Sequence, residues 1–212
     1  MSESELLQQI AQKEIKEDKI ADKVIEQPEL LSEIIEGLNS HEAHIKYGCC
    51  KVLRIISEKE PALLYPKIDF FIDHLDSDNN FFKWNAILIV ANLSFVDSKN
   101  RIEQIFDKYL LPISGPTLIT AANTIRGAAK IALAKPKLTD KITQELLKVE
   151  KAEYQTTECR NVVLGHVINS FSEFFDQIEN KRPVVELIRK QFKNTRSGTR
   201  KKAEKFLKKF TT

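Results

Sequence analysis

Glycine, cysteine and tryptophan are scarce in this sequence, and long apolar runs are missing. Of its 212 residues, 6 are glycine, 3 are cysteine and 1 is tryptophan. So few glycines, together with few alternating β-branched residues, argue against a sheet. No apolar run approaches the roughly 18 residues that a membrane-spanning helix needs. The sequence therefore predicts an all-α protein that does not enter a membrane.

The cysteines and the first residues bear on the compartment. Cys49, Cys50 and Cys159 are odd in number, and the adjacent pair diverges by about 100° on a helix, which excludes a disulfide framework. Cys49 is expected in the core. The start, MSESELLQQIAQKE, is acidic and polar, whereas a secretory signal is basic and then apolar. We expect an intracellular, cytoplasmic protein.

Motifs that carry catalysis are also missing. The sequence has no glycine-rich phosphate loop, no Cys-x-x-Cys and no GxSxG. His41 and His44 are three residues apart with Glu42 between them, but this is not the HExxH zinc pattern and no third ligand is near in sequence. The sequence predicts a non-enzyme without cofactor, metal or small-molecule substrate.

What the sequence does contain is a repeated turn and amphipathic helix. The clearest copy runs from Leu75 to Leu93, with a helix predicted from near Phe81 and capped by Asn80 or Asp78. If Lys83 is position zero, positions three, seven and ten form an apolar stripe. The same stripe recurs at intervals of 37 to 40 residues when position zero is Lys46, Lys83, Ala121, Arg160 or Arg200. Ser170, at position ten of the fourth copy, breaks the apolar stripe.

A second apolar helical segment precedes each copy, so the repeating unit is a pair of helices. Proline stands at or just before the start of four of these first helices, where its missing N–H costs nothing, at Pro28, Pro61, Pro136 and Pro183. Pro66 is predicted to kink or shorten the first helix of the second unit. Residues 1–27 are predicted to form an N-terminal helical cap, and residues 28–212 the repeats of a single domain.

This pattern resembles the HEAT family of armadillo-type helical repeats. In that family an aspartate in the inter-helix turn and a basic residue at the start of the second helix form a ladder between neighbouring units. In the second unit of this sequence, Asp76 or Asp78 and Lys83 match these two positions. The resemblance implies a right-handed α-α superhelix, a solenoid of about five two-helix units, whose second helices line a concave face. It implies an architecture and carries no functional site with it.

The predicted concave face centres on positions one, five, eight and twelve of the second helices, opposite the core stripe. Trp84 and Phe95 are either covered by neighbouring helices or exposed as anchors for a partner. With basic residues beside them, they predict a scaffold that binds another protein or peptide, an acidic one. The candidate partner-binding residues are Tyr47, Lys51, Arg54, Trp84, Leu88, Asn92, Phe95 and Arg126.

Charge is distributed unevenly and leaves an alternative open. Residues 1–42 carry 11 acidic and 4 basic side chains, a net charge of −7, whereas residues 181–212 carry 12 basic and 2 acidic ones, a net charge of +10. The basic C-terminal helix is either a solvated cap or a contact for nucleic-acid phosphates. The candidate residues for nucleic acid are Lys201, Lys205, Lys208 and Lys209.

Overall fold

The computed structural model describes residues 5–12 and 15–211, and within them the chain divides into two compact units. The first unit ends at Arg101, where helix α8 begins. Its helices are α1 (Glu5–Gln12), α2 (Glu17–Glu26), α3 (Leu31–Glu36), α4 (Ala43–Lys59), α5 (Pro61–Leu64), α6 (Ile68–Asp73) and α7 (Asn80–Leu93).

The second unit runs from Ile102 to the C-terminus. Its helices are α8 (Arg101–Gln104), α9 (Phe106–Leu110), α10 (Leu118–Ala134), α11 (Thr139–Lys148), α12 (Thr157–Phe174), α13 (Arg182–Lys190) and α14 (Ser197–Phe210). Short 3-10 turns extend or join many of these helices, such as Leu111–Ser114 after α9. None of the helices in the described part of the chain is both long and apolar enough to cross a bilayer.

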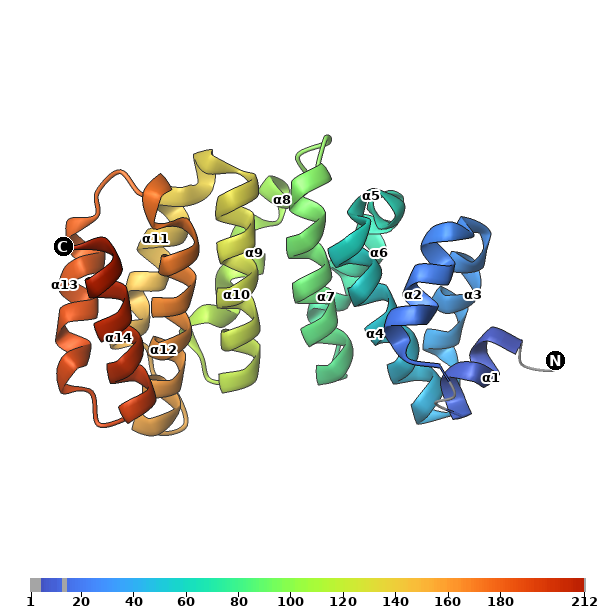
Figure 1. Cartoon of the computed structure of the whole chain (residues 1–212), viewed down its shortest axis with the longest axis horizontal. Coiled ribbons are helices and arrows are strands. Elements are labelled where there is room, and N and C mark those ends of the chain that lie inside the picture. Colours follow the sequence, from blue (N-terminus) through green and yellow to red (C-terminus); the bar gives the residue numbers. More distant parts are fainter. Residues whose placement is uncertain (1–4, 13–14, 212) are drawn as a thin grey trace. The chain divides into compact units, whose positions relative to one another are not determined.

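Each unit has two layers of helices. In the first unit, α2, α4 and α7 pack side by side, and α3, α5 and α6 pack behind them (Figure 1). In the second unit, α10, α12 and α14 form the corresponding row, with α9, α11 and α13 behind (Figure 1). We call the row formed by the second helix of each repeat, together with α2, the second-helix layer, and the other row the first-helix layer.

The predicted apolar stripe is the core of both units. Position seven of the first four copies, at Leu53, Val90, Ala128 and Val167, is at most 1% exposed. Ser170 is also buried, and its hydroxyl donates a hydrogen bond of 3.1 Å to the carbonyl of Ile125 on α10. A buried hydroxyl is tolerated when it has such a partner, so the exception in the stripe fits the core.

Two local predictions have different outcomes. The cap of α7 is Asn79, whose Oδ1 accepts from the N–H groups of Phe81 at 2.9 Å and Phe82 at 3.4 Å, so the predicted caps Asn80 and Asp78 were wrong. A run of turn formers offers several caps, and only the backbone geometry selects one. The interruption at Pro66 is confirmed, because α5 ends at Leu64 and a 3-10 turn leads into α6.

The N-terminal helices are packed onto the first repeat. Helix α2 lies against α4 and buries Ile20, Ala21 and Val24 to 1% exposure or less. Helix α1 lies against the same helix, at a place where the backbone of α4 carries Gly48. A Cβ at Gly48 would collide with the side chain of Ile10 on α1. The missing side chain of Gly48 is therefore what lets α1 sit this close to α4.

Replacing Gly48 with alanine should detach α1. Alanine favours the helical state of α4 by about 1 kcal/mol, but its methyl group has to displace Ile10. We expect the amides of residues 5–12 to exchange with solvent much faster while those of α4 stay protected, as hydrogen exchange would show. Gly198→Ala is the control, because a Cβ there meets only Arg196 Nε at 3.9 Å. Unchanged protection of α1 in Gly48→Ala would contradict this packing argument.

Candidate binding face

The exposed side of the second-helix layer is rotated from the predicted one. Position eight, predicted to be at its centre, is buried in the three central second helices, at Ala91, Ala129 and Ile168. On α10 the accessible side chains fall instead at positions minus two, two, five, nine and twelve: Ile119, Asn123, Arg126, Lys130 and Leu133. At 100° per residue this moves the centre of the exposed face by about 50°.

In the first unit the predicted aromatic residues differ in accessibility. Tyr47 is half-buried and packs on the start of α7, with its ring centroid 4.6 Å from that of Phe81. Trp84 is also half-buried. Phe95, just after α7, is 56% exposed. Phe95 is thus the aromatic side chain of this face with the most surface left for a partner.

Leu88 and Asn92 leave little surface for a partner. They are 9% and 4% exposed, respectively. The Asn92 amide donates a hydrogen bond of 2.8 Å to Ser57 Oγ on α4, so it joins two neighbouring helices. A buried amide held in this way stabilises the packing of the repeats.

The basic residues predicted for the first unit lie beside acidic ones. Lys51 Nζ is 3.1 Å from Glu17 Oε1 on α2, and Arg54 Nη1 is 3.0 Å from Glu58 Oε1 on its own helix. Further along α4, Lys59 contacts Asp18 and Asp22 of α2 at 2.7 and 2.8 Å. The acidic helix α2 therefore balances the positive charge of α4.

The second unit gathers cationic side chains from three neighbouring helices. Arg126 and Lys130 are on α10, His166 is on α12 and Lys202 is on α14. Lys202 Nζ donates a hydrogen bond of 3.1 Å to the carbonyl of Gly165, the residue before His166. We call these four residues the cationic strip. The sequence predicted only Arg126 among them. A helical wheel centred at positions two, five and nine would have found Lys130 and Lys202, whereas His166 lies at position six.

Burial is the main influence on the pKa values of the titratable side chains in and beside the strip, and nearby positive charges add to it for His166 and Lys202. Burial lowers the pKa of His166, and the positive charges of Lys202 and Arg126 lower it further. Burial also lowers the pKa of Lys202, with a further contribution from Arg196. Loss of hydration raises the pKa of the Glu173 carboxyl on α12, against the opposing effect of Lys130 and Arg126. An anion placed on the strip would stabilise the charged forms of His166 and Lys202.

The lysines predicted as a nucleic-acid contact lie on α14. Lys201, Lys205, Lys208 and Lys209 are all exposed. Helix α14 carries six basic residues and one acidic residue, Glu204. Lys209 Nζ lies 4.5 Å from the ring centroid of Phe210, a cation–π contact that orients this lysine.

Cys49 and Cys50, whose thiol groups can act as nucleophiles in enzymes, are buried in the core. Burial raises the pKa of the Cys49 and Cys50 thiols to about 12, so neither is a thiolate nucleophile near neutral pH. Within the described residues, no three histidine, cysteine or carboxylate side chains form a group that could hold a metal ion.

Comparisons with known proteins concern the architecture. No protein-family model and no curated protein matches the sequence. Among solved structures, the chain is similar to the designed armadillo repeat protein YIII(Dq)4CqI, with a TM-score of 0.64 and 15% identity over 95% of this chain and 89% of that one. The chain has an armadillo-like helical-repeat fold.

A second designed armadillo structure supports the same fold. It belongs to computationally designed armadillo repeat proteins for modular peptide recognition, and has a TM-score of 0.61 and 15% identity over 96% of this chain and 91% of that one. The predicted all-α solenoid class is therefore confirmed. At 15% identity, the similarity supports the architecture of the repeats but does not identify any binding residue.

His166 should make stability depend on pH. Its pKa in the folded chain is lower than the ordinary value of 6.5, so the unfolded chain binds the proton more readily. Its contribution is complete above about pH 6.5 and is lost as the pH falls through the folded-state pKa. Between about pH 7.5 and 5.5, the melting temperature should fall more steeply for the wild type than for His166→Gln. The difference corresponds to the uptake of at most one additional proton when the wild type unfolds. Parallel curves would contradict the assigned environment.

Proposed function

We propose that this protein is a non-enzymatic scaffold that binds acidic protein segments on the second-helix layer of its second unit. The observation that carries the proposal is the cationic strip, where three helices bring Arg126, Lys130, His166 and Lys202 to one face. The second designed armadillo structure described above belongs to proteins designed for modular peptide recognition, which supports a peptide as the kind of partner.

The chemistry of the strip favours carboxylates. Arg126 and Lys202 are permanently or nearly always charged, and a guanidinium binds a carboxylate through two parallel N–H donors. His166 adds a proton-dependent donor between them. Burial, and after it the repulsion from nearby positive charges, lowers the pKa of His166 and Lys202, and a peptide with several aspartate or glutamate residues would offset both effects.

The first unit offers a different kind of contact. Its basic side chains on α4 lie beside carboxylates of α2 and α4, so positive charge is not its dominant feature. Phe95 and the half-buried Trp84 provide apolar surface instead. We infer that this unit contributes apolar contacts to a protein partner, and that specificity for acidic residues comes from the second unit.

A labelled oligoglutamate peptide should bind the second unit, measured by fluorescence polarisation on the full chain. The double variant Arg126→Glu/Lys202→Glu should weaken binding by at least about tenfold, because it replaces two attractive charges with repulsive ones. Affinity should rise as the pH falls towards 6, since the bound peptide favours protonated His166, and His166→Gln should flatten this rise.

The matched control makes an equal change of net charge at other positions of the second unit. Lys151→Glu/Lys193→Glu replaces two exposed lysines that lie in turns outside the second helices. It should retain most of the affinity, losing only the long-range part that salt screens. Equal losses in the two double variants would show that net charge and not the strip binds the peptide, and would overturn the proposed site.

Nucleic-acid binding is the second candidate, favoured by the exposed lysines of α14. Lys201→Glu, Lys205→Glu and Lys208→Glu together should abolish salt-sensitive retention on single-stranded DNA if this candidate is correct, because each phosphate contact adds to the slope of log affinity against log salt. The variant should bind oligoglutamate nearly as well as the wild type. No retention of the wild type at low salt would eliminate this candidate.

A further inference from the structure

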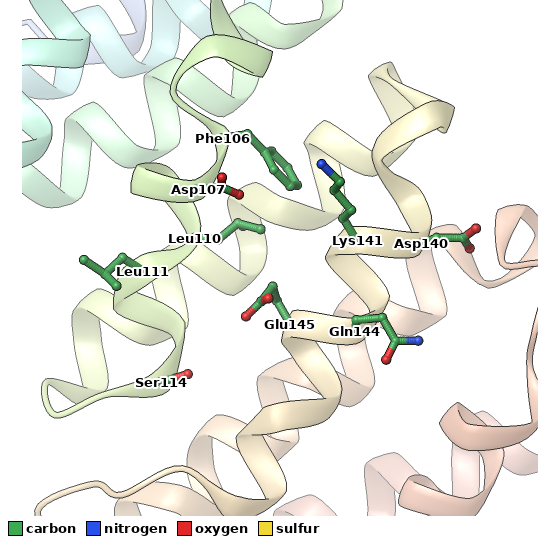
Figure 2. A pocket seen from close by; sticks show the side chains of 9 residues that line it. All are labelled: Phe106, Asp107, Leu110, Leu111, Ser114, Asp140, Lys141, Gln144 and Glu145. Atoms are coloured by element: carbon green, nitrogen blue, oxygen red, sulfur yellow. The ribbon is translucent and has the colours of Figure 1, made fainter.

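The first-helix layer of the second unit contains an open groove between α9 and α11 (Figure 2). Its volume is about 640 Å³, within the range of sites that hold a ligand or a few side chains. Phe106 and Leu110 of α9 form its apolar floor, each only 4% exposed. Lys141 and Glu145 of α11 point towards them from the opposite wall (Figure 2).

The groove forms where helix α9 is short, with only 5 residues. Helix α9 ends at Leu110, and Pro112 follows in the 3-10 turn Leu111–Ser114. This turn approaches α11. The two walls therefore close at the turn and leave the groove open beside α9.

The rim of the groove combines an apolar side chain with negative charge. Leu111 is 78% exposed, the highest exposure of any large hydrophobic side chain in the described part of the chain. The lining includes three carboxylates, Asp107, Asp140 and Glu145, and one lysine, Lys141, for a net charge of −2. Glu145 contacts Lys148 at 2.5 Å on its own helix, while Asp107 projects from the opposite wall.

We propose that this groove docks a short partner segment that carries a large apolar side chain next to a lysine or arginine. The apolar side chain would lie on Phe106 and Leu110 and be covered by Leu111, because burial of such surface gives most of the affinity. The neighbouring cation would lie between Asp107 and Glu145, where two carboxylates from opposite walls favour it. This site differs in position and in charge from the cationic strip.

The test uses a library of random dodecapeptides selected for binding to the full chain. Selected peptides should pair leucine, isoleucine, phenylalanine or tryptophan with lysine or arginine. Asp107→Lys/Glu145→Lys should weaken their binding by about tenfold or more, and Leu111→Ala by several-fold. Circular dichroism and the melting temperature of each variant verify that it is folded. Asp107 is exposed and the Glu145 side chain is 33% exposed, and charges at the surface contribute little to stability.

Asp176→Lys/Glu179→Lys is the matched control, because it makes the same change of charge at two exposed positions outside the groove. Peptides that bind the control as tightly as the wild type, but bind the groove variant weakly, would support the proposal. Peptides that bind all three proteins equally would overturn it. Recovery of acidic peptides alone would also overturn it, while leaving the proposed function of the cationic strip intact.

Discussion

The structure depends on the burial of one apolar stripe on each second helix against its neighbours. Leu53, Val90, Ala128 and Val167 occupy equivalent positions and are nearly inaccessible to water. Within each unit a repeat cannot bury this stripe alone, so the second helices pack on one another, α4 on α7 in the first unit and α10 on α12 and α12 on α14 in the second. The spacing of about 40 residues is therefore a consequence of packing, because each pair of helices has to bring the next second helix into the equivalent position of the following repeat.

Small side chains decide how closely the second helices approach. Ala91 and Ala129 are fully buried at position eight, where the sequence indicated an exposed face. At Gly165, a Cβ would meet Thr199 Oγ1 at 3.0 Å and Lys202 Nζ at 3.3 Å on α14. Close approach at these positions covers one side of each helix and rotates the accessible side. It also lets Lys202 reach the backbone of α12 and take its place in the cationic strip.

The repeats were predictable from the sequence because their signal is local and periodic. The apolar stripe, the first helices and the break at Pro66 follow from residues within a few turns of one another. The binding face was less predictable, since it depends on contacts between repeats. Lys51 looks like a free cation in the sequence, yet its partner Glu17 lies 34 residues away. Asn92 likewise looks like a ligand for a peptide backbone, but Ser57 on the preceding second helix accepts its hydrogen bond.

The pairing between α2 and α4 is why the proposed recognition by charge is assigned to the second unit. Glu17, Asp18 and Asp22 lie within 3.1 Å of lysines on α4, so much of the acidity at the start of the chain is matched by nearby lysines. In the second unit, α14 packs beside α12 in the second-helix layer. It carries six basic residues and only one acidic residue. Positive charge on this helix therefore exceeds negative charge, and in the proposed function an acidic partner would supply the difference. The groove on the other layer of this unit has a lining of net negative charge, so the two proposed sites would favour partners of opposite sign.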